Sequence, residues 1–239
     1  LNTLELYGSN SNFSWTNRGI IFQGVNGATI NVTKDTGNVI AFGKEINGEL
    51  LLCKFRTDWK DLIIDCGNKN VTAFQGFDIK PEIKAENIYV SISNVIIKRF
   101  KEAGINGGYM TDCIFENLTI EGEEGAKGFI PWRENCQLVN STIRYCDHGI
   151  FVPNFGEANI KMIGGNLMVN KSNITFEGGG YLMCNSVLNT VYIAEPRITQ
   201  RIISIINPSG FHIYNLTFSN CQVASFGAGS LIDLTGING

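Results

Sequence analysis

The sequence predicts an all-β solenoid, and three observations carry this prediction. Asn94, Asn117 and Asn140 are spaced 23 residues apart, and a fixed period in the twenties is typical of stacked repeats. Apolar and polar residues alternate on both sides of each Asn, which is the pattern of β-strands. Four stretches share one pattern, an apolar residue, a variable position, Asn, then apolar–polar–apolar: 91–98, 114–121, 138–144 and 212–219.

Each of these Asn residues is predicted to form a tight corner between two strands. The inward side chains around Asn117 are Phe115 and Leu118, so the step across the corner is three residues and not two. Asn adopts the left-handed backbone conformation more readily than other bulky residues, which suits such a corner. Corner side chains of successive coils would lie about 4.8 Å apart and bond in a ladder. We expect the ladder to contain Asn94, Asn117, Asn140, Asn173 and Asn215, with Asp61 as an earlier member.

A second corner is predicted after the core strand of each coil. Three-residue steps recur there, from Ile97 to Phe100, from Ile143 to Cys146 and from Phe218 to Cys221. Two bends in each coil are what a triangular coil needs. Between residues 177 and 212 the pattern defines no register.

The segments GATINVTKDTGNVIAFG (27–43) and WKDLIIDCGNKN (59–70), with Asn at the sharp corner of coils of this length, resemble the right-handed parallel β-helix of the pectin-lyase-like superfamily. The resemblance spans Gly24 to Cys221. The two segments look most like the β-helix domains of bacteriophage tail spikes and appendages. It implies binding of a host surface polysaccharide, a homotrimer and a place in the virion tail.

Length and composition fit one β-helix domain over residues 1–239, because a solenoid grows as a single unit. We expect an irregular lead-in at 1–23 and, at 222–239, a C-terminal cap or the start of another segment. No run of 18 apolar residues exists, so no membrane span is predicted. The net charge of −3 and the pI near 5.5 argue against a nucleic-acid partner. An acidic polysaccharide stays open, because local patches can oppose the global sign.

The seven cysteines are predicted to be buried structural thiols, and disulfides are the alternative. Cys113 and Cys136 are 23 residues apart, as the repeat is, and Cys146 and Cys221 follow a core strand. Thiols behave as small apolar side chains and are among the most buried residue types. No CxxC motif occurs, so neither a metal site nor a cofactor is predicted. Reduced thiols indicate synthesis in a reducing cytosol, which suits a virion part made in its host cell.

Lys98, Glu121 and Arg144 each follow the core Ile of successive coils, so they are predicted to form an outward column of alternating charge. Two interpretations stay open. The column is a cross-strand ion ladder, worth about 0.2–1 kcal/mol for each opposed pair. Alternatively, it is a carboxylate flanked by cations on a sugar-binding face.

Glu121 and Asp147 are the candidate catalytic pair, with His148 beside Asp147. A glycosidase needs two carboxyl groups, one of them protonated, about 5–5.5 Å apart for retention or about 6.5–9.5 Å apart for inversion. Neighbouring coils supply such separations. The alternative is that both acids are merely solvated and that His148 is a hydrogen-bonded turn residue. For a lyase mechanism, the candidate bases are Lys98, Arg133 and Arg144.

Sugar rings stack on exposed aromatic side chains, and Trp15, Trp59 and Trp132 all lie next to polar or charged residues. We therefore predict partial exposure of these indoles. The preferred ligand contact is Trp132 with Arg133, and a loop anchored by a buried indole is the alternative. Predicted substrate-binding residues are Trp132, Arg133, Arg144, Lys98 and Trp59.

The long connections 101–112, 122–135 and 147–165 are where function would concentrate. Three hypotheses follow. The first is a tail-spike-like domain that binds host surface polysaccharide. The second is a depolymerase, hydrolase or lyase, acting on capsule or wall glycan. The third is a structural spacer without a ligand.

Overall fold

A computed structural model provides the structure of the chain. It describes residues 4–5, 19–46, 49–52, 56–76, 89–108, 110, 112–131, 136–153, 157–158, 160–177, 181–182, 187–194, 201–206, 212–213, 216–224 and 232–233. These residues form strands, bends and turns, and no α-helix occurs among them. The same part of the chain accordingly holds no helix that is long and apolar enough to cross a membrane.

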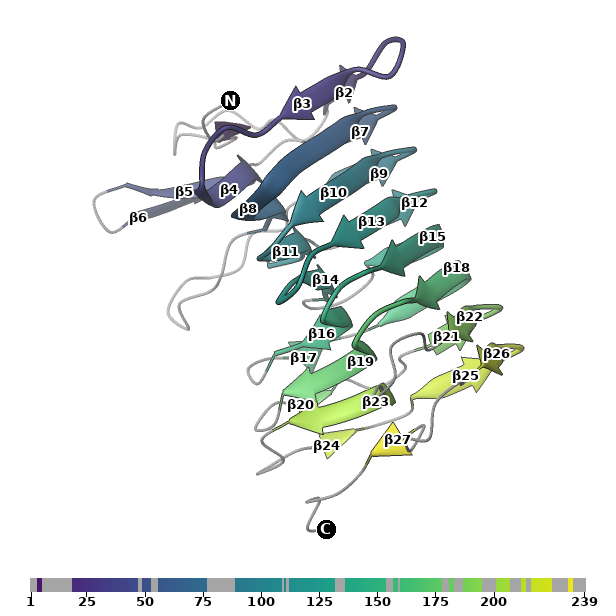
Figure 1. Cartoon of the computed structure of the whole chain (residues 1–239). Helices are drawn as coiled ribbons and strands as arrows, with labels where there is room; N and C mark the ends of the chain where they lie inside the picture. Colours follow the sequence, from purple (N-terminus) through teal and green to yellow (C-terminus); the bar gives the residue numbers. More distant parts are fainter. Residues whose placement is uncertain are drawn as a thin grey trace.

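The strands stack into three faces of a coil, separated by two corners (Figure 1). The first face precedes the first corner and contains β2 (Gly19–Gln23), β7 (Arg56–Lys60), β9 (Val90–Ser93), β12 (Ile114–Glu116), the start of β15 (Gln137–Arg144), the start of β18 (Lys161–Met168), β21 (Val187–Asn189) and β25 (Thr217–Ser219). The second face lies between the corners and contains β3 (Thr29–Asn31), the start of β8 (Ile63–Gln75), β10 (Ile96–Phe100), β13 (Thr119–Gly122), the ends of β15 and β18, β22 (Tyr192–Ala194) and β26 (Gln222–Ala224).

The third face follows the second corner and contains β1 (Leu4–Glu5), β4 (Thr36–Ala41), the end of β8, β11 (Ala103–Asn106), β14 (Lys127–Ile130), β16 (His148–Val152), β19 (Ser172–Glu177), β23 (Arg201–Ile206) and β27 (Ile232–Asp233). Two small sheets complete the described strands: an antiparallel pair, β5 (Gly43–Ile46) and β6 (Glu49–Leu52), and a parallel sheet of β17 (Glu157–Ala158), β20 (Tyr181–Leu182) and β24 (His212–Ile213).

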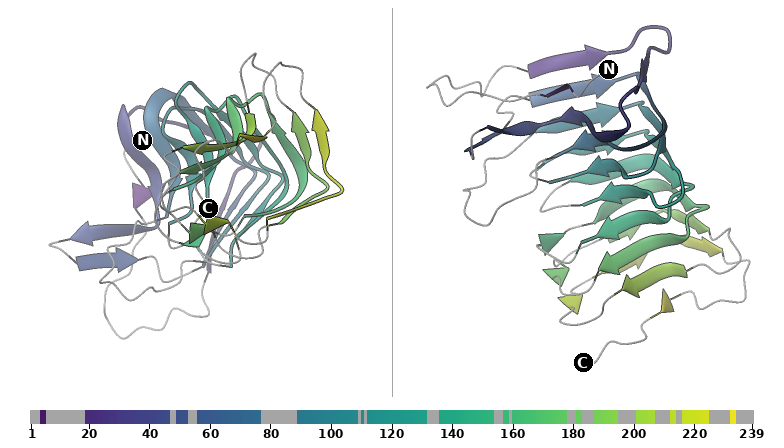
Figure 2. Two further views of the ribbon diagram at one scale, coloured as in Figure 1. Left: turned by 90° about the horizontal axis from the view of Figure 1, so that it is seen from below. Right: turned by 60° about the vertical axis from the view of Figure 1, so that its left-hand side comes forward.

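Every strand pair within the three faces is parallel, and each strand pairs with its counterpart in the next coil. The chain is therefore a parallel β-helix, as predicted. Figure 2 shows the stacked coils along their axis and from the side. Strands β2 and β26 belong to this stack, so the described coils begin before Gly24 and continue past Cys221.

Inward side chains stack in apolar columns that run the length of the coil. One column is built from fully buried aliphatic residues of the second face, paired in register: Ile64, Ile97, Ile120, Ile143, Leu167 and Ile193. A second column follows the first face: Trp59, Ile92, Phe115, Leu138, Met162 and Leu188. Burial of each such side chain stabilises the fold by about 1.5–3 kcal/mol.

The first corner is the predicted Asn edge. Asp61, Asn94, Asn117 and Asn140 have φ values of 47–54°, the left-handed conformation that the three-residue step requires. The Asn117 side-chain amide donates to Oδ1 of Asn94 over 3.1 Å, and the Asn94 amide donates to Oδ1 of Asp61 over 3.1 Å. Gln23 extends the ladder, because its Nε2 donates to Oδ2 of Asp61 over 3.1 Å.

Beyond Asn140 the corner is held by other residue types. Gly164 (φ 68°), Thr190 (φ 57°) and Asn220 (φ 53°) occupy the edge in the next three coils. A Cβ atom on Gly164 would lie 2.4 Å from Oδ1 of Asn140, so the close approach of that amide requires glycine. The ladder of side-chain amides cannot continue through a glycine.

One predicted ladder member does not belong to the edge, and a second lies outside the described residues. The prediction for Asn173 is wrong: it lies in β19 on the third face, 1% exposed, and accepts a hydrogen bond from Nδ2 of Asn170 over 2.9 Å. Asn215 lies outside the described residues. The stretch 212–219 is displaced from the repeat, because Phe218 pairs with Leu188 and places Asn220 at the corner. Cys221 therefore follows the first corner and not the second.

The thiols of the described cysteines are arranged largely as predicted. Cys66, Cys113, Cys136 and Cys146 are buried, whereas Cys221 is half-buried. None of these five forms a disulfide. Burial raises the pKa of the Cys66 thiol to about 12, so this thiol remains protonated at neutral pH.

Candidate functional site

The predicted charged column is present on the outer surface of the second face. Lys98 pairs in register with Glu121, and Glu121 pairs with Arg144. Asp65 extends the column by one coil, because it pairs with Lys98. Nε of Arg144 donates to Oε1 of Glu121 over 2.7 Å.

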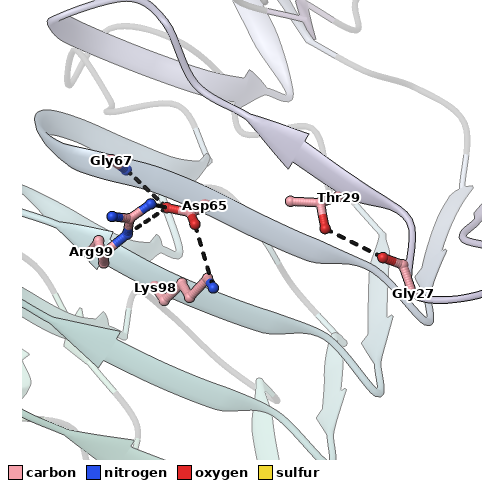
Figure 3. Close-up of polar contacts among 6 residues, drawn as sticks. All are labelled: Gly27, Thr29, Asp65, Gly67, Lys98 and Arg99. Carbon is pink, nitrogen blue, oxygen red and sulfur yellow. Dashed lines mark hydrogen bonds and ion pairs between the residues drawn. The ribbon is translucent and has the colours of Figure 1, made fainter.

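Asp65 forms ion pairs with two cations of the next coil, Lys98 and Arg99 (Figure 3). Its Oδ1 accepts hydrogen bonds from Nε of Arg99 over 2.7 Å and from the backbone amide of Gly67 over 3.1 Å. Its Oδ2 lies 3.4 Å from Nζ of Lys98. Burial would raise the pKa of Asp65, but the hydrogen bonds from Arg99, Gly67 and Lys98 hold this pKa below its ordinary value. The carboxylate is therefore ionised and fixes the Arg99 side chain at the second corner.

The second corner carries one feature that the repeat does not predict, a missing residue. Arg99, Tyr145 and Val169 turn this corner with φ values of 59°, 64° and 56°. The coil that lies between the coils of Arg99 and Tyr145 has no residue at this corner position. Lys98 pairs with Glu121 and Phe100 pairs with Gly122, so Arg99 has no counterpart. The chain passes directly from Glu121 to Gly122, and the corner is one residue short.

This omission coincides with a hollow that we call the corner notch. It is an open pocket of about 240 Å³ lined by Arg99, Glu121, Gly122, Glu123, Glu124 and Tyr145. Arg99 comes from the coil before it and Tyr145 from the coil after it. Gly122 is buried at its base, where an added Cβ would lie 2.7 Å from Sγ of Cys146.

The far wall of the notch is a tight turn. The Glu123 amide donates to the Phe100 carbonyl over 2.9 Å, and the Ala126 amide donates to the Glu123 carbonyl over 3.0 Å. Gly125 has a φ of 87°, which a residue with a side chain rarely adopts. The turn places Glu123 and Glu124 at the notch, and no ion pair to either carboxylate is found in the described part of the chain.

Tyr145 provides the aromatic surface of the notch. Tyr145 is 39% exposed, and the Arg144 guanidinium lies 5.1 Å from the centroid of the Tyr145 ring. The cation stacks on the ring and holds it in place. The notch thus combines an aromatic side chain, a guanidinium donor and three carboxylate acceptors on a rigid coil.

Asp147 does not line the notch. It follows the second corner, on the opposite side of Tyr145 from Glu121, and its Oδ2 lies 2.8 Å from Nζ of Lys171. Partial burial would raise the pKa of Asp147, but Lys171, the Gly125 amide and His148 lower it below its ordinary value. Glu121 and Asp147 are therefore held by separate cations on two sides of a corner.

His148 lies on the outer surface of the third face. Its Nδ1 is 2.8 Å from Oγ1 of Thr175, and its ring centroid is 5.2 Å from that of Phe151. Burial lowers the pKa of His148, and the nearby Lys127 adds to this effect, whereas Asp147 raises it. The net result is a pKa below the ordinary value, so His148 is neutral at pH 7.

The prediction for Trp59 is wrong. Trp59 is 1% exposed and lies in β7, where its ring stacks on Phe22 with centroids 4.0 Å apart and its Nε1 donates to Oγ1 of Thr57 over 3.2 Å. The residues on either side of Trp59 in the DWK segment are polar because they point outward, so they do not indicate that the indole is exposed. Trp132 and Arg133 lie outside the described residues, as does Trp15.

Sequence reasoning missed Arg99, Tyr145, Glu123 and Glu124 as members of one site. A signal for them exists. The step from the core Ile across the second corner is three residues in two neighbouring coils, yet the step from Ile120 to Gly122 is only two. A shortened step at a corner indicates a gap in the column of corner residues.

No protein-family model and no curated protein matches this sequence. Among solved structures, the chain is similar to the A-module of mannuronan C-5 epimerase AlgE4 from Azotobacter vinelandii, at 12% identity and a TM-score of 0.35, with 90% of this chain and 82% of that chain covered. It is also similar to the AlgE6 A-module from the same organism, at 11% identity and a TM-score of 0.29, with 89% and 80% covered. Scores this low carry no argument about activity.

Among the described residues, no group of three or more His, Cys, Asp or Glu side chains is arranged to hold a metal ion. The residues that line the notch offer hydrogen bonding, charge and one aromatic ring. Such a set can accept and donate hydrogen bonds to several hydroxyl groups at once.

Proposed function

We propose that this chain is a glycan-binding β-helix domain and that the corner notch holds one sugar unit of the bound chain. The observation that carries the proposal is the omitted corner residue, which opens a hollow of about 240 Å³ between the guanidinium of Arg99 and the ring of Tyr145. A hollow of this size accommodates a single sugar ring, and the glycan would continue along the flat second face.

The proposed contacts follow from the chemistry of the lining. The Tyr145 ring offers an apolar surface to the C–H groups of a sugar, while Glu123 and Glu124 accept hydrogen bonds from its hydroxyls. Arg99 donates to ring or hydroxyl oxygens. Because Asp65 and Arg144 already fix Arg99 and Tyr145, little side-chain entropy is lost when the ligand binds.

Binding is favoured over hydrolysis by the state of Asp147. A general acid in a glycosidase must be protonated near neutral pH, which requires a raised pKa. The pKa of Asp147 is lowered, and its carboxylate is engaged by Lys171. Glycan cleavage is the alternative function. It is favoured by the three carboxylates that line one notch, Glu121, Glu123 and Glu124.

The finer proposal is that the glycan is a host cell-surface polysaccharide and that the domain is part of a homotrimeric tail spike or appendage on a virion. Its support is the resemblance of segments 27–43 and 59–70 to such proteins. The five described cysteines without disulfides agree with assembly in a reducing cytosol.

Titration of the full chain with a panel of neutral, acidic and amino-bearing oligosaccharides, followed by calorimetry, tests the proposal. Tyr145→Ala should weaken binding about 5–30-fold, the loss typical of an anchoring Tyr. Tyr89→Ala is the matched control, because Tyr89 is 43% exposed and does not line the notch. Equal affinities for the two variants would show that the glycan binds elsewhere, and absence of binding to the whole panel would refute the proposal.

The same incubations decide between binding and cleavage. New reducing ends would show hydrolysis, and unsaturated uronate absorbance would show a lyase reaction. If either signal appears and is lost in Glu123→Gln or Glu124→Gln, the depolymerase function replaces the proposed one. Bound glycan that is recovered intact supports recognition without cleavage.

A further inference from the structure

Cys113 and Cys136 occupy the same place in two successive coils. Each precedes the first strand of its coil, and the residues that follow them, Ile114 and Gln137, pair in register. The Gln137 amide donates to the Cys113 carbonyl over 2.9 Å. Both cysteines point into the core, with exposures of 0% and 2%.

The two sulfur atoms have defined surroundings. Sγ of Cys136 donates to the Met110 carbonyl over 3.1 Å, and Sγ of Cys113 accepts the Val90 amide over 3.3 Å. A hydrogen bond between the two thiols, together with burial, raises the pKa of Cys113 far above its ordinary value. The two cysteines directly precede the register pair Ile114 and Gln137, which places them next to each other in neighbouring coils, and they are not joined by a disulfide in this structure.

The backbone geometry suits a covalent link. Neighbouring parallel strands lie about 4.8 Å apart, and the Cα atoms of a disulfide lie about 4.4–6.8 Å apart. The Cβ atoms of in-register residues are slightly farther apart than in an average disulfide, so closure requires a small approach of the two backbones at this point, together with rotation of both side chains, and no change of register.

We propose that Cys113 and Cys136 form a disulfide that links two successive coils once the protein meets an oxidising environment. The oxidant is a low-molecular-weight disulfide such as glutathione disulfide. One thiol loses its proton and attacks the glutathione disulfide, which releases one glutathione thiolate. The second protein thiol then attacks the mixed disulfide and releases the other. The protein loses two protons and two electrons, and glutathione disulfide gains both.

Burial controls when this link forms. A thiolate is the attacking species, and a buried thiol with a raised pKa forms little thiolate at neutral pH. Oxidation is therefore slow in the closed coil and proceeds when the two coils separate transiently. Once formed, the link opposes that separation, because it joins neighbouring units of a solenoid whose stability depends on nearest-neighbour contacts.

The experiment incubates the full chain with glutathione disulfide, blocks remaining thiols in acid and maps tryptic peptides by mass spectrometry. Cleavage after Lys101, Lys127, Arg133 and Arg144 places Cys113 in peptide 102–127 and Cys136 in peptide 134–144. We expect these two peptides to be joined, and to separate after treatment with dithiothreitol. The linked protein should melt about 6–12 °C higher than the reduced protein, as expected for a closed loop of this length.

Two variants make the result specific. Cys136→Ser should show no rise in Tm with oxidant, whereas Cys146→Ser, which keeps both thiols of the pair and loses another buried one, should respond as the wild type does. If Cys136→Ser fails to fold, the peptide map of the wild type decides alone. Absence of the joined peptides, attachment of Cys113 to a different cysteine, or a lower Tm after oxidation would each overturn the proposal.

Discussion

Replacement of Ile120 by Ala tests the inward columns on which the fold depends. Ile120 is fully buried between Ile97 and Ile143, and its Cγ2 fills the space that a side chain on Gly104 would occupy. Loss of three buried carbons costs about 2.4 kcal/mol. An unrelaxed cavity of roughly 60 Å³ adds about 1.5 kcal/mol. Because backbone hydrogen bonds fix the spacing of the coils, the walls cannot close the cavity. We therefore expect a loss of about 4 kcal/mol.

Urea unfolding followed by circular dichroism measures this loss as a shift of the midpoint at constant m-value. Ile114→Ala is the matched control, since Ile114 lies on the same coil, is 50% exposed and undergoes the same chemical change. Its expected cost is about 1 kcal/mol or less. Equal losses for the two variants, or a larger loss for Ile114→Ala, would show that the assignment of inward and outward faces is incorrect.

Three further predictions concern the corner, the core and the pH response. In urea unfolding, Asn117→Ala should be about 1–2 kcal/mol less stable than Asn117→Gly, because only Ala has the steric cost of the left-handed conformation; equal stabilities would contradict the corner. Trp59→Ala should lose about 3–5 kcal/mol yet bind glycan in calorimetry as the wild type does, and weaker binding would place Trp59 at the ligand. The folded-state pKa of His148 lies below the ordinary value of 6.5, so the stability gained from a neutral ring is present above pH 6.5 and is lost as the pH falls through the folded-state pKa. Urea midpoints of His148→Gln should lack this part of the pH dependence, and an unchanged profile would contradict the burial of the ring.

The sequence predicts the architecture wherever one residue type serves one structural need. Asn94 and Asn117 are recognisable because a tight left-handed corner with a polar side chain favours Asn. Later corners escape this pattern, since Gly164 and Thr190 meet the same backbone requirement without an amide. Longer connections between strands also lengthen the coils that contain these later corners. This explains why Asn173 was assigned to the edge incorrectly. Once an insertion is allowed within a coil, the repeat no longer distinguishes a corner Asn from any other Asn near the expected position.

The site was less accessible to sequence reasoning than the fold. The column of Lys98, Glu121 and Arg144 follows from strand alternation and is present. The assignment of Glu121 and Asp147 to one catalytic pair rests on the separation that neighbouring coils supply, and it does not take into account the second corner that lies between the two residues. Tyr145 could not be recognised as a surface aromatic, because it stands at a corner where the alternation is interrupted.

On the proposed function, the short corner at Gly122 gives a stacked fold a ligand site through a change of length at a single bend. The packing of the interior depends on the straight segments, so deleting or inserting a single codon at a bend alters the outline of one layer and leaves the layers above and below intact. Recognition in such proteins can therefore evolve by edits of length at the bends, independently of the residues that keep the molecule folded.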